Sequence, residues 1–436
     1  MPINNKYMTQ KLLASVVFFL FLQLGYAQDT IKIMQYNLLN YGVSTGFCSE
    51  SNNNTLDKDE SLRTVLEYAA PDIIAVNEFG KTELLQTNFI NNNLNIKGAT
   101  YWKSDNIINH AQSKIINHIF YNSNKMVLKK HNYIAAKYRD VDVYEFYFKT
   151  TAICMGDTTK LVYVVAHLKA GNDNASISDR NTTSQNIMNY LANHNINDNV
   201  ILSGDLNMYG SDEPAYYNFT QSQSYGNALF IDPVSNADIG SWNTGSFTQY
   251  HTQSTHYNSK KCAASGGLND RFDLFLISDE VRFGNKGLRY VTDSYKAIGN
   301  DGNHYNSAVN DGDNLAVSDE IANALYTVSD HLPITIKIVL GNPLGTDEEL
   351  KNFNIFASPN PATDHITLHF YSEISQIITF DVITTTNMTA RTVQTYCESG
   401  SNTFRINTTN LTDGFYIVKM TSENGETTHC KVVVKK

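Results

Sequence analysis

A chain of 436 residues is longer than one typical domain, so we expect two folded units. Its 33 basic and 43 acidic side chains give a net charge of −10, which excludes broad electrostatic attraction to nucleic acid but not a local basic groove. Charged residues make up only 17% of the chain while Tyr, Phe and Asn are abundant, which excludes whole-chain disorder and favours a globular, β-rich protein.

The first predicted element is a signal peptide at residues 1–27. Lys6 and Lys11 precede an apolar run over 12–24, and a small-residue cleavage site ends at Ala27. This run is shorter than the roughly 20 apolar residues that a membrane-spanning helix needs. No later segment is long and apolar enough to span, so we predict an exported protein without a stable membrane span.

Residues 28–340 are predicted to form one layered unit. The runs "DIIAV", "KLVYVVAHL", "NVILSG" and "RFDLFLIS" are almost continuously apolar, which is typical of strands covered on both faces. Apolar residues recur at helical spacing over 57–70, with Asp57 or Asp59 as the expected N-cap, and again over 178–194. Strands that alternate with helices predict an α/β or α+β layered domain.

A turn-rich, polar linker is predicted at 341–352, followed by a second unit at 353–436. In this unit short alternating runs such as "HITLHF", "IITFDVI" and "GFYIVKM" are separated by turn signals. This spacing predicts a small antiparallel β-sandwich.

The chain has five cysteines, and an odd number cannot pair completely. They are Cys48, Cys154, Cys262, Cys397 and Cys430, and their wide spacing resembles no zinc signature. Cys397 and Cys430 fall in the same small unit, where they either form a disulfide or remain free thiols.

Several apolar runs of the first unit hold an amide, carboxylate or imidazole at or near an end. These residues are Asn37, Glu78, His167, Asp205 with Asn207, Asp273, and Asp330 with His331. Each alone has an ordinary alternative, as a turn cap, a solvated strand end or a hydrogen-bonded core histidine. Strands stacked in sheets bring their ends to a common rim, so the joint pattern favours a functional site there.

The chemistry that suits this set is hydrolysis of a phosphate ester. Glu78, with Asn37, Asp205 and Asp330, offers hard oxygen donors suited to Mg²⁺ or Mn²⁺. The cation would neutralise charge on the phosphate oxygens and the leaving group. Asp205 thereby counts both as a metal ligand and as a catalytic residue.

The histidines and Asn207 supply the other catalytic roles. We expect His331 to act as general base toward water, with the adjacent Asp330 fixing its tautomer. His167, paired with Asp273, would be cationic or donate a hydrogen bond to a phosphate oxygen. Asn207 would donate to the phosphoryl group in the transition state or orient the water.

Two loops have open interpretations. Segment 242–261 interleaves aromatic and cationic residues, which either stack bases and track a phosphate backbone or pack onto the domain. We expect Lys169, Arg180 and Asn207 to contact the substrate, together with Tyr250 and His251 from this segment on the first alternative. Run 299–314 is rich in Gly, Asn and Asp; it is either a solvated loop or a structural Ca²⁺ site, whose ligands would be Asp301, Asp311 and Asp313.

The ordered motifs "HLK", "GDLN", "RFD" and "SDH", after strands holding Asn37 and Glu78, resemble the endonuclease/exonuclease/phosphatase superfamily. The resemblance covers residues 31–338. It implies an α+β fold, a four-layer αββα sandwich, with a Mg²⁺- or Mn²⁺-dependent site at one end of two packed sheets. All the polar positions named above are intact, which disfavours an inactive copy.

The second unit has its own resemblance. "ASPNPATDHITL", "DGFYIVKM" and "CKVVVKK" look like the type A sorting domain of the type IX secretion system. This implies that the chain reaches the periplasm by its signal peptide and then crosses the outer membrane with the type IX machinery as partner. The alternative is a carbohydrate- or surface-binding sandwich, which no aromatic platform supports.

We therefore predict a monomeric phosphodiesterase, secreted or at the cell surface, that hydrolyses extracellular DNA or RNA. One alternative is a sphingomyelinase-like or small-molecule phosphodiesterase or phosphatase. The chain lacks an obvious exposed hydrophobic hairpin for bilayer insertion, which disfavours a lipid substrate. The other alternative, a non-enzymatic surface adhesin, is disfavoured by the intact set of polar residues.

Overall fold

The computed structural model describes residues 30–149, 159–225, 230–234, 237, 240–258, 262–284, 286–340, 355–358, 360–372, 374–385 and 388–436. The predicted signal peptide, Cys154, Lys260, Lys261 and the predicted linker 341–352 lie outside these residues. Among the helices that are described, none is both long and apolar enough to cross a bilayer.

The first sheet has the strand order β11-β13-β1-β2-β4-β3, and β12 also pairs with β13. Its only parallel neighbours among the described strands are β1 and β2, which helix α2 connects. The strands are β1 (Thr30–Tyr41), β2 (Ile73–Gly80), β3 (Trp102–Lys103), β4 (Ile115–Asn122), β11 (Leu288–Tyr290), β12 (Lys296–Ala297) and β13 (Ile334–Leu340).

The second sheet has the strand order β5-β6-β7-β8-β10-β9. Strands β7 and β8 run parallel, with helix α4 between them in the chain. The strands are β5 (Met126–Ile134), β6 (Val141–Phe148), β7 (Lys160–His167), β8 (Val200–Asp205), β9 (Phe230–Ile231) and β10 (Asp273–Ser278).

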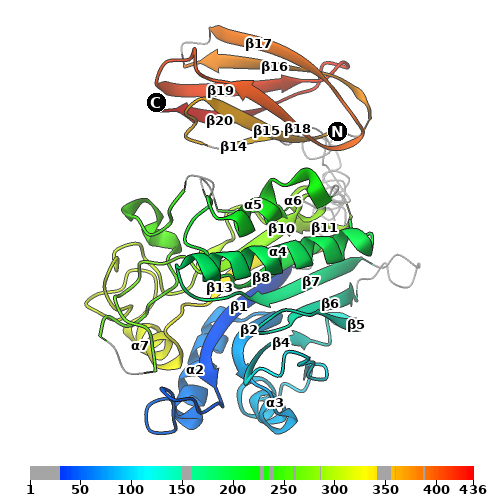
Figure 1. The fold of residues 1–436 in the computed structure, drawn as a ribbon. Coiled ribbons are helices and arrows are strands. Elements are labelled where there is room, and N and C mark those ends of the chain that lie inside the picture. Colours follow the sequence, from blue (N-terminus) through cyan, green and yellow to red (C-terminus); the bar gives the residue numbers. More distant parts are fainter. Residues whose placement is uncertain are drawn as a thin grey trace, which may run out of the picture.

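The two sheets pack face to face, as the alternation of side chains along β1 shows. Ile31 and Ile33 join the core between the sheets, whereas Tyr36 and Leu38 join the core beneath the helices of the first sheet. The helices covering the first sheet are α2 (Thr55–Ala69), α3 (Glu83–Phe89), η1 (Ile90–Leu94) and α7 (Asp319–Val328). The helices covering the second sheet are α4 (Asn174–Asn193), α5 (Pro214–Thr220) and α6 (Asp279–Phe283). The short 3-10 turns η3 (Gln223–Tyr225) and η4 (Gly245–Tyr250) lie in the connections of the second sheet. The predicted four-layer α+β sandwich is confirmed (Figure 1).

Both predicted helices form, but each begins earlier than its apolar pattern indicated. Helix α2 is capped by Asn54, whose side chain accepts from two backbone N–H groups, rather than by Asp57 or Asp59. Helix α4 is capped by Asp173, which accepts from the N–H of Ser176. In each case the N-cap is a polar side chain that lies ahead of the segment with apolar periodicity, so the sequence pattern missed the true start.

The C-terminal unit is all β and antiparallel, as predicted. A three-stranded sheet has the order β14-β15-β18 and a four-stranded sheet the order β17-β16-β19-β20. The strands are β14 (Ile355–Ser358), β15 (His365–Ser372), β16 (Gln376–Thr384), β17 (Thr389–Cys397), β18 (Gly400–Asn407), β19 (Gly414–Thr421) and β20 (Thr427–Val434). Apolar side chains from both sheets, including Leu368 and Val418, share one core.

Cys397 and Cys430 are free thiols, so the alternative that they form a disulfide is wrong. The strand register places Cys397 opposite Gln376 and Cys430 opposite Val418, which keeps the two sulfurs on different parts of the sheet. The disulfide that does form joins Cys48 to Cys262, a pair that the sequence analysis did not single out.

Candidate active site

The end of β1 and the end of β2 are bent so that two predicted site residues meet. The strands pair Asn37 with Asn77, and their register then shifts. Leu39, Asn40 and Glu78 have φ angles of 47°, 50° and 57°, a local departure from strand geometry that redirects side chains. As a result Nδ2 of Asn37 donates to Oε1 of Glu78 over 3.2 Å, and the N–H of Asn40 donates to Oε2 of Glu78 over 2.9 Å.

The second sheet brings three more predicted residues to the same place. The parallel register of β7 and β8 sets His167 beside Asp205, and the antiparallel register of β10 sets Asp273 on the other side of Asp205. Nε2 of His167 lies 3.4 Å from Oδ2 of Asp205. Nδ2 of Asn37 donates to that same Oδ2 over 2.9 Å, so Asn37 links the two sheets at their shared rim.

His331 completes the cluster and makes its closest contact with Asp273. Its Nδ1 donates to Oδ2 of Asp273 over 2.7 Å, and its Nε2 lies 3.5 Å from Nδ2 of Asn37 and 3.7 Å from Oδ2 of Asp205. The side chains of His331, Asp273 and Asp205 are all nearly fully buried. A single polar cluster thus gathers residues from β1, β2, β7, β8, β10 and the segment before β13.

Both side-chain pairings predicted from the sequence are wrong. Asp330 accepts from the N–H of Ala264 over 2.7 Å, and the carboxylate beside His331 is that of Asp273, which therefore is not the partner of His167. Among the described side chains, Asp330 is linked to His331 only through Gln253, whose Nε2 donates to Oδ2 of Asp330 over 3.4 Å and lies 2.7 Å from Nε2 of His331.

Within the described part of the chain, one group of acidic, His or Cys side chains has the geometry of a metal site. The ligand atoms of Glu78, His167 and Asp205 all lie within 4.8 Å of one another. Asn37 adjoins this group through its amide N–H, whereas the predicted ligand Asp330 is not part of it. A carboxylate pair with one imidazole is a donor set that Mg²⁺ or Mn²⁺ can use.

The electrostatics of this group suit a divalent cation. Burial raises the pKa of Asp205 to about 7, and the carboxylates of Asp273 and Glu78 act in the same direction against the opposing His331 ring. Buried negative charge of this kind is costly unless a cation compensates it. The residues present therefore fit a divalent metal ion.

The pKa values of the two histidines are shifted in opposite directions. Burial, together with the positive charges of Arg139 and His331, lowers the pKa of His167 well below its usual value. His167 is therefore neutral, not the cation that we predicted as one alternative. Burial also acts to lower the pKa of His331, but Asp273 and Asp205 outweigh it and raise that pKa well above its usual value.

Asn207 lies next to the metal-ligand group, as predicted. Its φ of 51° turns the chain just after β8, and its N–H donates to Oδ1 of Asp205 over 3.2 Å. Its Nδ2 donates to the carbonyl of Leu168 over 3.3 Å. Lys169, the next residue in the chain, is half-buried and holds its Nζ 5.7 Å from the ring centre of Tyr138.

Arg180 does not contact the substrate side of the cluster, contrary to our prediction. Its side chain is fully buried, and its Nε and Nη2 donate to both carboxylate oxygens of Glu213 over 2.8 Å. Its Nη1 donates to the carbonyls of Lys169 and Gly171. Arg180 therefore fixes the loop after β7 against the loop that carries Glu213.

Replacing Arg180 with alanine is expected to lower the free energy of unfolding by about 3 kcal/mol, because it leaves the buried carboxylate of Glu213 without a partner. Chemical denaturation followed by circular dichroism measures this loss. The control is Arg63→Ala, which removes one long hydrogen bond at the surface and should change stability by less than about 0.5 kcal/mol. Equal stability of the two variants would contradict the structural role of Arg180.

Most of the aromatic segment packs onto the domain where it is described, whereas Tyr257 is 57% exposed. Trp242 is buried and its Nε1 donates to the carbonyl of Ala237 over 2.7 Å; His251 is fully buried and bonded to the carbonyl of Trp242. The predicted substrate contact by His251 is therefore wrong. Tyr250 is half-buried with its ring 6.1 Å from that of Tyr295, so packing, not display toward a ligand, is its observed role.

The Asp-rich loop does not assemble the calcium site that we considered. Oδ1 of Asp301 accepts from the N–H of Asn303 and from His304, and its Oδ2 accepts from the N–H of Leu315. These bonds outweigh burial and lower the pKa of Asp301 to about 2. The carboxylates of Asp301, Asp311 and Asp313 do not form a metal-ligand group, so the loop closes on itself.

Four residues around the cluster escaped the sequence analysis. Nε2 of Gln253 lies 2.7 Å from Nε2 of His331, and Oδ1 of Asn77 accepts from the N–H of Asp205 over 2.7 Å. Lys58 is buried and donates to the carbonyls at the bend of β1, and Arg139 donates to the carbonyls of His167 and Leu168. Lys58 stands in the run "DKDE", whose charge gives no sign of burial.

Comparison with known families identifies the C-terminal unit. Residues 355–435 match the family model described as "Secretion system C-terminal sorting domain". The resemblance predicted for this unit is therefore confirmed. No curated protein matches the chain.

Solved structures similar to the chain include three described here. The crystal structure of D. rerio TDP2 complexed with single strand DNA product is 13% identical, covers 71% of this chain and 99% of its own, and has a TM-score of 0.43. The human Nocturnin catalytic domain is also 13% identical, with coverages of 72% and 98% and a TM-score of 0.43. An endonuclease/exonuclease/phosphatase from Beutenbergia cavernae is 11% identical, with coverages of 93% and 99% and a TM-score of 0.41.

Proposed function

We propose that this protein is an exported, divalent-metal-dependent phosphodiester hydrolase, most directly a nuclease. The observation that carries the proposal is the convergence of Glu78, His167 and Asp205 beside the His331–Asp273 pair. Bound among Glu78, His167 and Asp205, a Mg²⁺ or Mn²⁺ ion would supply Lewis-acid stabilisation of a phosphate oxygen and offset the negative charge of Asp205.

The His331–Asp273 pair supplies the base. Nε2 of His331 faces the cluster and, in the deprotonated form of the ring, is the atom that accepts a proton from the attacking water. Asp273 accepts the Nδ1–H, which sets the tautomer and stabilises the imidazolium that forms. Gln253, next to Nε2, holds the ring from the opposite side. Asp330 has no part in this relay and instead anchors the loop of Ala264.

Two groups are suited to the phosphate. The amide of Asn207 lies just after β8, where it can donate a hydrogen bond to a phosphoryl oxygen. Arg139 places a guanidinium near the cluster, and its charge acts on Glu78 and Asp205 as well as on His167. An anionic substrate would thus meet a local positive charge on a protein of net negative charge.

One surface feature favours a nucleic acid substrate over a lipid. Tyr138 is 38% exposed, its hydroxyl donates to Asp179, and the ammonium groups of Lys137 and Lys169 lie 4.9 Å and 5.7 Å from its ring centre. An exposed ring between cations, next to Arg139, combines base stacking with attraction to a phosphate backbone. We propose that this rim contacts the strand that is cut.

The sorting domain sets where the enzyme acts. A unit of this family at the C-terminus supports export by the type IX system to the cell surface or the medium. Together with the predicted signal peptide, it supports our proposal that the substrate is extracellular DNA or RNA. A non-enzymatic adhesin would have no need of the buried His331–Asp273 pair.

Purified full-length protein tests this function. Incubated with Mg²⁺ or Mn²⁺, it should cleave plasmid or RNA and bis-p-nitrophenyl phosphate, and leave sphingomyelin intact. Turnover of sphingomyelin with uncut plasmid would replace the nuclease proposal by the sphingomyelinase-like alternative. No product from any of the four substrates would end the hydrolase proposal altogether.

Removing the metal is expected to stop activity, and Glu78→Gln is expected to shift the metal requirement. A chelator should abolish hydrolysis and added Mg²⁺ or Mn²⁺ should restore it. In Glu78→Gln the metal concentration for half-maximal activity should rise by at least about tenfold, because one charged ligand is lost. Glu83→Gln, an exposed acid at the start of α3, is the matched control. Activity that survives chelation contradicts the metal site.

A further inference from the structure

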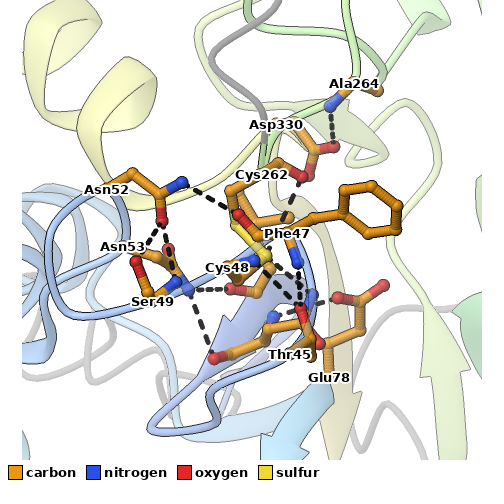
Figure 2. Close-up of a disulfide and its surroundings, with 12 residues drawn as sticks. Thr45, Phe47, Cys48, Ser49, Asn52, Asn53, Glu78, Cys262, Ala264 and Asp330 are labelled. Atoms are coloured by element: carbon orange, nitrogen blue, oxygen red, sulfur yellow. Dashed lines mark hydrogen bonds between the residues drawn. A yellow bond between two sulfur atoms is a disulfide. The ribbon is translucent and has the colours of Figure 1, made fainter.

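The disulfide between Cys48 and Cys262 joins two loops that are far apart in the sequence and that both lie beside the active site. One loop, 42–54, follows β1; the other, 251–272, leads from η4 into β10. The two cysteines are 214 residues apart in the chain. Figure 2 shows the disulfide with Glu78 on one side and with Asp330 and Ala264 on the other.

On the first side the disulfide adjoins the residue that holds Glu78. Asn40 donates its N–H to Oε2 of Glu78 over 2.9 Å and its Nδ2 to Sγ of Cys48 over 3.4 Å. Cys48 is itself fixed, because its N–H and carbonyl both bond to Thr45. The sulfur of Cys48 is thus one residue removed from a proposed metal ligand.

On the second side the disulfide adjoins the segment that holds the base. Ala264, two residues after Cys262, donates its N–H to Oδ2 of Asp330 over 2.7 Å, and its carbonyl accepts from Ser254 over 2.9 Å. Gln253, next to Ser254, contacts His331. Displacement of Cys262 would therefore act on both residues of the "DH" pair.

Loop 42–54 has little else to hold it against the second loop. It contains no helix or strand beyond the single turn after β1, and its largest apolar side chain, Phe47, is 77% exposed. Its backbone and side-chain bonds are mostly internal, such as those from Ser49 and Asn52. Apolar burial therefore does not dock the loop, and the covalent link between Cys48 and Cys262 is its firmest tie.

We propose that the Cys48–Cys262 disulfide is a positioning element of the active site, so that the enzyme becomes fully active only after oxidation. This inference rests on the proposed hydrolase function. The two thiols form the disulfide by exchange with a disulfide donor, which takes up two electrons and two protons and becomes a dithiol. In a reducing cytoplasm the two cysteines remain thiols, and in an oxidising compartment they form the disulfide.

The consequence is protection of the producing cell. A nuclease that is already folded before export would attack the cell's own nucleic acid. With the two loops unlinked, Asn40, which holds Glu78, and Gln253, which contacts His331, lose the covalent tie beside them, and misplacement by about 1 Å is enough to cost about 100-fold in rate. Export and activation would then be coupled by one bond.

Reduction of the full-length protein tests the proposal. Oxidised protein is treated with a phosphine reductant, the reductant is removed, and kcat and KM for bis-p-nitrophenyl phosphate are measured alongside Mn²⁺ binding by electron paramagnetic resonance. We expect kcat/KM to fall by about 10- to 100-fold, Mn²⁺ to bind more weakly, and oxidised glutathione to restore both. Mass spectrometry after alkylation shows which cysteines have reacted.

Matched variants separate this disulfide from the other thiols. Cys48→Ser combined with Cys262→Ser should reproduce the reduced state and no longer respond to reductant. Cys397→Ser combined with Cys430→Ser, which removes two free thiols from the sorting domain, should behave like wild type. Cys154→Ala added to the Cys397→Ser, Cys430→Ser variant leaves only Cys48 and Cys262.

Each outcome bears on one proposal. Unchanged kcat/KM and Mn²⁺ binding after reduction would overturn the positioning role, while an active oxidised enzyme would leave the hydrolase function standing. Inactive oxidised protein would instead refute the function itself. Loss of the circular-dichroism signal in step with activity, in the reduced protein or the Ser variant, would show that the bond serves global stability and would also overturn the positioning role.

Discussion

Replacing His331 with alanine is expected to slow phosphodiester hydrolysis by about 10²- to 10⁴-fold, because no other imidazole has its Nε2 turned into the cluster and its Nδ1 held by a carboxylate among the described residues. The effect should fall on kcat, with little change in KM, since the base acts in the chemical step. Steady-state kinetics on bis-p-nitrophenyl phosphate and on plasmid, at saturating Mg²⁺ or Mn²⁺, measure it.

The chain contains a close control for this substitution. His365 also follows an aspartate, and its Nδ1 lies 2.6 Å from Oδ1 of Asp364, but this pair belongs to the sorting domain. His365→Ala should hydrolyse at the wild-type rate. If His331→Ala and His365→Ala are equally active, the catalytic role of His331 is excluded.

Asp273→Asn and Asp330→Asn are expected to differ sharply. The first should lower kcat by about 10³- to 10⁴-fold, because an amide beside Nδ1 neither fixes the tautomer of His331 as firmly nor stabilises its imidazolium. The second should cost about tenfold or less, because the amide oxygen of Asn can still accept the N–H of Ala264. Both kcat values are measured as for His331→Ala.

This comparison also decides between the two assignments of the carboxylate partner. Sequence adjacency favours Asp330, and the observed contact favours Asp273. The two substitutions are the same chemical change, and both side chains are buried, so each serves as the control of the other. A larger loss in Asp330→Asn than in Asp273→Asn would contradict the mechanism proposed for the pair.

The fold and the membership of the cluster were predictable because they depend on local patterns. Strands with nearly continuous apolar residues must be buried on both faces, and a polar residue at the end of such a strand lies at a rim. Asn37, Glu78, His167, Asp205 and His331 were therefore found without knowledge of the topology. The sheet registers then brought them together.

The pairings within the cluster were not predictable, because they depend on side-chain direction and on contacts between distant segments. Asp330 and His331 are adjacent in sequence but do not pair, whereas Asp273 reaches His331 across 58 positions. Arg180 resembled a substrate ligand because its buried partner, Glu213, stands 33 residues away with no local signal. The partner of a buried charge is a property of the packed structure alone.

The closing strand of the sorting domain has a consequence for the stability of that unit. Strand β20 pairs with β19 along its whole length, its Val432 and Val434 lie in the shared core, and Ala362 from the start of the unit bridges to Val434. Loss of β20 would leave one edge of β19 unpaired and expose apolar side chains of the core to water. A proteolytic cut before Thr427 is therefore expected to unfold the whole β-sandwich and not merely to shorten it.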